Sequence, residues 1–93
     1  MSNWWADFTG VWGQFIGTIN FGQGVVNRHT TVLASISEIS QPSGEPLDFP
    51  FIGGAVMTIH NVAPQDNGTV LMVIDTGWDS PVNIRIRMAL DPG

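Results

Sequence analysis

Residues 82–90, VNIRIRMAL, constrain the fold more than any other stretch of the chain. Large apolar side chains alternate there with polar or smaller ones, which is the period-2 pattern of a β-strand with one buried and one wet face. The apolar row is Val82, Ile84, Ile86, Met88 and Leu90, and the other row is Asn83, Arg85, Arg87 and Ala89. The pattern predicts a strand that buries its aliphatic face and carries two arginines on the other.

Four further segments indicate strands, namely residues 14–21, 30–39, 55–62 and 69–75. Gly68 suits a turn that needs a positive φ, and Pro81 suits the start of a strand that needs no hydrogen-bond donor there. We therefore expect the last three strands to form an antiparallel meander. With five to seven strands, short turns and little helix, residues 1–93 are expected to form a single all-β domain, a small antiparallel β-sandwich or barrel.

The longest loop-like insert is residues 40–50, SQPSGEPLDFP, which contains three prolines and a glycine. Proline fixes φ and lacks the backbone N–H that a helix interior or a central strand needs. The sequence therefore predicts an irregular connection there.

The aromatic segment of residues 3–15, NWWADFTGVWGQF, admits two interpretations. One helical stripe contains Trp4, Trp5, Phe8, Val11, Trp12 and Phe15. Gly10 and Gly13 oppose a helix, because each costs about 1 kcal/mol in a helix interior relative to alanine. We expect an aromatic N-terminal arm, either a short helical turn or irregular, over residues 4–8, and then a strand from about Val11 in which glycines leave slots for neighbouring aromatic rings.

The composition leaves little polar cover for so small a domain, since only 12% of the residues are charged and 43% are hydrophobic. Residues 69–75 are apolar on both faces, so one row of that strand has to be covered by another layer of the chain, a second subunit or a ligand. The two rows are Leu71 with Val73, and Val70 with Met72 and Ile74. We assign interface contacts or packing to Trp4, Trp5, Phe8, Trp12, Phe15, Val70, Met72 and Ile74.

The charge and the motifs argue against several classes of function. A net charge of −5, from eight acidic and three basic residues, disfavours nucleic acid and anionic membranes as partners. The lack of cysteine excludes disulfides, zinc-thiolate sites and cysteine nucleophiles. The acidic residues have no spacing that forces two carboxylates together, and neither His29 nor His60 lies in a zinc-binding pattern. We expect a non-enzymatic protein with no cofactor and no metal.

The chain start, MSNWWADF, has no basic region followed by an apolar run of signal-peptide length. No segment reaches the roughly 18 apolar residues of a membrane-spanning helix. The expectation is a soluble cytoplasmic protein, with release by a leaderless route as the alternative.

Trp78 stands in the polar connection TGWDSP, where a large ring is hard to bury. Exposed tryptophans often form platforms on which sugar rings stack, and neighbouring polar side chains then supply directional hydrogen bonds. The candidate ligand-binding residues are Trp78, Asp79, Asn83 and Arg85. We expect a lectin-like, carbohydrate-binding protein that acts as a homo-oligomer, because repeated weak sites gain avidity.

Two other classes of function stay open. In the first, the protein is a structural or assembly component, and the aromatic arm and the uncovered apolar row are subunit contacts. In the second, the protein is membrane-active and inserts Trp4, Trp5, Phe8 and Trp12 into the bilayer interface, although the lack of lysine weakens this alternative.

Overall fold

The computed structural model describes residues 2–40 and 50–91, and this part of the chain contains seven β-strands. Their bounds are β1 Ser2–Val11, β2 Gln14–Asn20, β3 Thr31–Ile39, β4 Pro50–Phe51, β5 Thr58–Pro64, β6 Thr69–Asp75 and β7 Val82–Asp91. The predicted all-β fold class is confirmed. Most of the predicted irregular insert, residues 41–49, lies outside the described residues.

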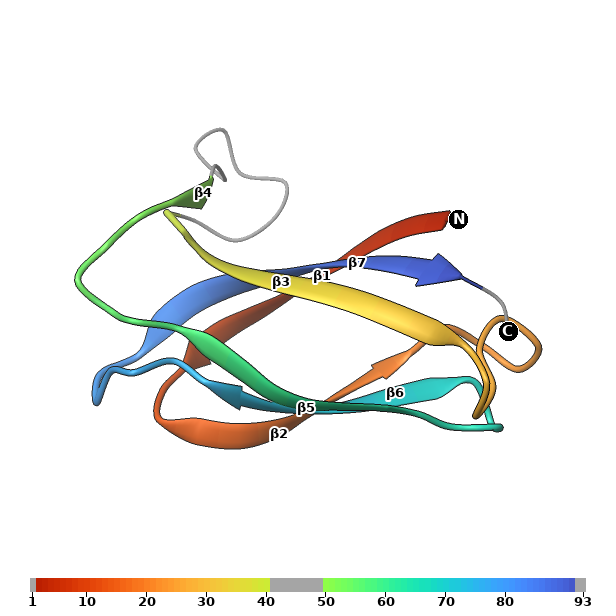
Figure 1. Cartoon of the computed structure of the whole chain (residues 1–93). Coiled ribbons are helices and arrows are strands. Elements are labelled where there is room, and N and C mark those ends of the chain that lie inside the picture. Colours follow the sequence, from red (N-terminus) through yellow and green to blue (C-terminus); the bar gives the residue numbers. More distant parts are fainter. Residues whose placement is uncertain (1, 41–49, 92–93) are drawn as a thin grey trace.

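The strands form two antiparallel sheets that face each other as the layers of a sandwich (Figure 1). Sheet A has four strands in the order β1, β7, β3, β4, and sheet B has three strands in the order β2, β6, β5. The prediction left a small antiparallel β-sandwich and a barrel open, and the two separate sheets make the fold a sandwich.

The two most apolar strands lie inside their sheets, each between two neighbours, and face one another across the core. From β7 the core receives Ile84, Ile86, Met88 and Leu90, and from β6 it receives Val70, Met72 and Ile74. Burial of a row of this kind is the main favourable contribution to the stability of the sandwich. The row of Leu71 and Val73 points to the outer face of sheet B instead, where Leu71 is exposed.

The predicted C-terminal meander is wrong in its last step. β5 and β6 form a hairpin, but β7 pairs with β1 and β3 in the other sheet. The connection of residues 76–81 is longer than the two-residue turn of a tight hairpin, and it crosses from sheet B to sheet A. The buried Thr76 hydroxyl lies 3.3 Å from the carbonyl oxygen of Gly13 and 3.2 Å from that of Trp78, so it holds this crossing together.

The predicted helical or irregular arm over residues 4–8 is also wrong, because β1 begins at Ser2 and pairs in regular register with β7 as far as Phe8. Trp4, Ala6 and Phe8 take one face. Ala6 and Phe8 pack against the core, whereas Trp4 is 39% exposed and meets the ring of Phe21 edge-on at 5.1 Å between centroids. Asn3, Trp5 and Asp7 take the other face. The apolar residues that matched a helical stripe thus match a strand equally well. The expected stripe is divided between the two faces, and no single aromatic face is formed.

Two glycines that a helix would not tolerate lie in the irregular end of β1 and in the turn between β1 and β2. Gly10 and Gly13 have φ of 65° and 66°, in the left-handed region that favours glycine. Gly13 donates its N–H to the carbonyl oxygen of Trp78 and accepts the N–H of Thr76, both at 2.9 Å. The first and last crossings between the sheets are therefore hydrogen-bonded to each other.

The expected slot beside a glycine is present at Gly17 on β2. Its position faces the core, and a Cβ atom there would lie 2.8 Å from Ile74 Cδ1 and 3.4 Å from Phe8 Cζ. The missing side chain thus makes room for one aliphatic and one aromatic neighbour. Phe8 also meets Phe15 edge-on, with the ring centroids 6.0 Å apart.

Candidate functional site

The outer face of sheet A is a grid of side chains from three neighbouring strands, because β7 pairs with β1 on one side and with β3 on the other. Three cross-strand rows follow from the register. They are Asn3, Ala89 and Leu33; Trp5, Arg87 and Ser35; and Asp7, Arg85 and Ser37. Directly opposed side chains of an antiparallel pair lie about 5 Å apart at Cβ, so each row is a set of contacting neighbours.

In the third row, Asp7 and Arg85 form an ion pair. Arg85 donates from Nε to Asp7 Oδ1 at 2.8 Å and from a terminal nitrogen to Oδ2 at 3.0 Å. Only 7% of the Arg85 side chain and 9% of the Asp7 side chain are exposed. The Arg85 guanidinium carbon also lies 4.5 Å from the ring centroid of Trp5, which is a cation–π contact that orients the indole.

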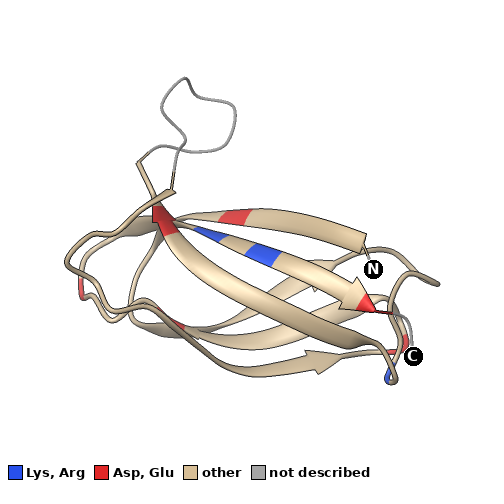
Figure 2. Ribbon diagram, turned by 45° about the horizontal axis from the view of Figure 1, so that its top comes forward, with Lys and Arg blue, Asp and Glu red and all other residues tan. Residues whose placement is uncertain are grey.

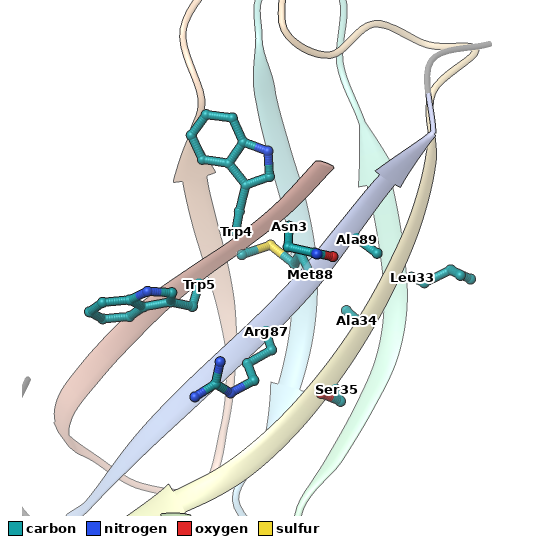
Figure 3. A pocket seen from close by; sticks show the side chains of 9 residues that line it. All are labelled: Asn3, Trp4, Trp5, Leu33, Ala34, Ser35, Arg87, Met88 and Ala89. Atoms are coloured by element: carbon teal, nitrogen blue, oxygen red, sulfur yellow. The ribbon is translucent and has the colours of Figure 1, made fainter. Parts of the chain in front are cut away.

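The first two rows enclose an open groove of about 450 Å³ (Figure 3). It is hollow because the methyl group of Ala89 lies among larger side chains. The outward-facing residues that line it are Asn3, Trp5, Leu33, Ser35, Arg87 and Ala89. Trp4, Ala34 and Met88, whose positions belong to the inner face of the sheet, also line the groove.

The groove combines an aromatic wall with a positive charge. Trp5 is 52% exposed although Arg85 contacts its ring. Arg87 reaches from β7 toward β1, and Asn3 extends its amide over β7 (Figure 3). No ion pair of Arg87 is present among residues 2–40 and 50–91, whereas Arg85 pairs with Asp7 and Arg28 with Asp66. Figure 2 marks two arginine positions in blue along β7, the strand that contains Arg85 and Arg87.

Of the four predicted ligand-binding residues, Trp78 and Asp79 lie in the connection from β6 to β7, and Asn83 and Arg85 lie on β7. Trp78 is 45% exposed and has its indole near Gly54; Asp79 beside it is exposed. Asn83 and Arg85 share the outer face of β7, but both side chains make internal contacts. The Asn83 amide oxygen accepts the N–H of Gly10 at 3.1 Å, and Arg85 holds Asp7. Ligand binding by these four residues stays a prediction.

The residues of the groove could not be found from the sequence without the pairing of β1 with β7. The period-2 pattern of residues 82–90 places Arg87 and Ala89 on the wet face, but it does not show which strand lies beside them. The alternation of Asn3, Trp5 and Asp7 against Trp4, Ala6 and Phe8 was the available signal for β1. The helical stripe in the same residues obscured it.

A second, smaller hollow of about 150 Å³ lies between β3 and the segment that leads from β4 to β5. The residues that line it are Ile36, Ser37, Glu38, Phe51, Ile52, Gly53, Ala55 and Met57. Its volume is below the roughly 300 Å³ at which ligand pockets usually begin. The groove on sheet A is therefore the stronger candidate.

Within the described ranges, no three His, Asp or Glu side chains come close enough to hold a metal ion. His60 and Asp75 approach to 3.8 Å on the outer face of sheet B, in a strand whose register shifts between Ile59 and Asn61. No described segment is a helix of the length and hydropathy that crossing a bilayer requires.

Fold and groove together define an all-β sandwich with an aromatic and cationic surface site. No family model, curated protein sequence or solved structure matches the chain. The function is therefore argued from the groove itself.

Proposed function

We propose that the protein is a non-enzymatic, lectin-like module that binds carbohydrate in the groove on sheet A. The observation that carries this proposal is the half-exposed Trp5 beside Arg87 and Asn3, in a hollow of about 450 Å³. Small-molecule sites typically measure about 300–1,000 Å³ and combine apolar walls with a few oriented polar groups.

The chemistry of the lining suits a sugar ring. One face of a pyranose presents C–H groups that pack on an indole, and its hydroxyl groups need donors and acceptors at the rim. Asn3 supplies both kinds of group, Ser35 supplies a hydroxyl, and Arg87 supplies donors. The contact with Arg85 fixes the Trp5 ring before the ligand arrives, which lowers the entropic cost of binding.

Binding by one shallow site is expected to be weak, so we propose that the protein acts as a homo-oligomer. The outer face of sheet B, opposite the groove, carries three apolar side chains. Ile16 of β2 pairs with Val73 of β6, and Leu71 lies two residues before Val73 on the same face of β6. Ile16 is 70% exposed. Self-association through this row would leave the groove open on each copy and would raise avidity without new sugar contacts.

The test compares two exposed tryptophans. Glycan-array screening and calorimetry on the wild type are followed by the variants Trp5→Ala and Trp78→Ala, with circular dichroism as the control for folding. The proposal expects Trp5→Ala to abolish binding and Trp78→Ala to retain it. Absence of glycan binding by the wild type would refute the function, and loss of binding only in Trp78→Ala would move the site to the connection between β6 and β7.

A second candidate, a structural or assembly protein without a ligand, is favoured by the same apolar row on sheet B. It predicts an oligomer by light scattering, its dissociation by Ile16→Glu, and no carbohydrate binding in either form. The carbohydrate proposal instead predicts that the monomeric Ile16→Glu protein still binds sugar, with a lower apparent affinity for multivalent glycans.

A further inference from the structure

Arg87 is the charged residue of the groove. Its guanidinium forms no ion pair with the residues that the structure describes. Its cross-strand neighbours are Trp5 and Ser35, neither of which carries a charge. Asp7 lies one row further along β1, but both of its carboxylate oxygens accept hydrogen bonds from Arg85. Arg87 is thus exposed, with its planar set of donors available to a ligand.

Of the nine described residues that line the groove, Arg87 alone is charged. The protein as a whole has a net charge of −5, so an acidic ligand is repelled by most of its surface. The groove differs from that surface in having a cation and no lining carboxylate. An arginine fork matches a carboxylate with two parallel hydrogen bonds, which are stronger than those between neutral groups.

We propose that the ligand of the groove is a carboxylate-bearing sugar, a uronic or sialic acid, whose carboxylate binds Arg87 while its ring packs on Trp5. This inference rests on the proposed carbohydrate-binding function and adds the class of sugar. Trp5 and Arg87 are direct cross-strand partners, so one sugar residue contacts both. Asn3 and Ser35 are then the partners of the ring hydroxyls.

The experiment uses pairs of sugars that differ only in the carboxylate. Methyl glucoside is compared with methyl glucuronoside, and methyl galactoside with methyl galacturonoside, by calorimetry and by NMR titration of the full chain. For the pair with the matching ring stereochemistry, we expect the dissociation constant of the acid to be about tenfold lower than that of the neutral sugar, which corresponds to about 1.4 kcal/mol. The advantage should shrink as salt rises from low to 0.5 M, because screening weakens the charge contact.

Two variants with the same net charge locate the effect. Arg87→Gln should bring the ratio of the two dissociation constants close to one. Arg28→Gln removes an arginine that lies outside the groove and pairs with Asp66, and it should keep the ratio near ten. A ratio that falls equally in both variants would assign the preference to net charge and overturn the inference.

The remaining outcomes separate the inference from the function on which it rests. Equal affinity for acidic and neutral sugars would overturn the acidic-sugar inference and leave carbohydrate binding intact. Absence of binding to all four glycosides and to an array of neutral and acidic oligosaccharides would overturn both. Binding of an acidic peptide through Arg87, with no sugar bound, would also overturn both and assign the groove to a protein partner.

Discussion

Removing the carboxylate of Asp7 tests the claim that the outer face of sheet A is organised by a buried charge pair. Asp7→Asn keeps the size and shape of the side chain, but it removes the carboxylate charge that accepts two hydrogen bonds from the buried Arg85 guanidinium. The pair is almost fully enclosed, with 7% and 9% of the two side chains exposed, and it has two hydrogen bonds of 2.8 and 3.0 Å. Solvent therefore compensates little of the loss.

Breaking a buried ion pair by removing one partner costs roughly 3–5 kcal/mol. We take the lower end, about 3 kcal/mol, since the contact of Arg85 with the Trp5 ring remains and itself contributes about 1 kcal/mol. A chain of 93 residues has a total stability of about 5–14 kcal/mol, so the loss is a large fraction of it. At about 4–8 °C per kcal/mol for a domain of this size, the melting temperature should fall by about 12–24 °C.

Urea unfolding followed by tryptophan fluorescence measures the free energy, and thermal circular dichroism measures the melting temperature. The matched control is Asp66→Asn, which breaks the exposed pair with Arg28 and should have a much smaller effect. The double variant Asp7→Leu with Arg85→Met should recover most of the stability, because it removes both charges together. A loss below about 0.5 kcal/mol in Asp7→Asn, the range of ordinary surface substitutions, would refute the reasoning.

Three further changes probe a turn, the groove and an exposed ion pair. Gly77→Ala should lower the free energy of unfolding by about 2 kcal/mol or more in urea titrations, because its φ is 64° and a Cβ atom would lie 2.2 Å from the Val56 carbonyl oxygen. Ala89→Leu should fill the groove and abolish sugar binding in calorimetry, while the melting temperature stays near that of the wild type, because position 89 faces outward. The hydrogen bond from the Arg28 side chain lowers the pKa of Asp66 in the folded protein. The pair therefore stabilises the fold above the unfolded aspartate pKa of about 3.9, and this contribution is lost as the pH falls through the lower folded pKa. An NMR titration of the Asp66 carboxylate measures the folded pKa.

Each of these changes has its own control. Gly10 has nearly the same φ as Gly77 but nothing within 4 Å of the added Cβ, so Gly10→Ala should cost less, and an equal cost would remove the steric part of the argument. Sugar binding that survives Ala89→Leu would place the site outside the groove. Arg28→Gln should return the pKa of Asp66 toward its ordinary value, and an unchanged pKa would show that Arg28 does not cause the shift.

The strands were predictable where one periodicity was dominant. Residues 69–75 match β6 at both ends, and the alternation in residues 82–90 matches the burial of β7 except at Arg85, which was expected on the wet face and is buried in its ion pair with Asp7. β1 was missed because its tryptophans and phenylalanines fit both a period of 2 and a period near 3.6. The partner of β7 was missed because the turn residues between β6 and β7 suggest a hairpin. In the structure, this connection crosses to the other sheet and is hydrogen-bonded to Gly13, which lies about sixty residues earlier in the sequence.

The groove was less predictable than the strands, for the same reason. Arg87 and Ala89 were assigned to the wet face from sequence, but the wall that makes them a site comes from Trp5 on β1. The prediction of a ligand at Trp78 used the expected exposure of its ring and its polar neighbours in the sequence, and Trp5 is exposed as well. Side chains from distant segments become neighbours only through the strand register, which a single sequence does not encode locally.

The pairing of the first strands with the last ones has a consequence for biosynthesis. β1 and β2 pair with β7 and β6, so the first twenty residues, with three of the four tryptophans, wait for residues 69–91 before they can form their sheets. At translation rates of roughly 5–20 residues per second, that interval lasts about 4–14 seconds. Folding of the sandwich is therefore completed only after the last strand has been made. A ribosome that stalls before residue 82 holds a nascent chain whose aromatic first strand remains open to association with other chains.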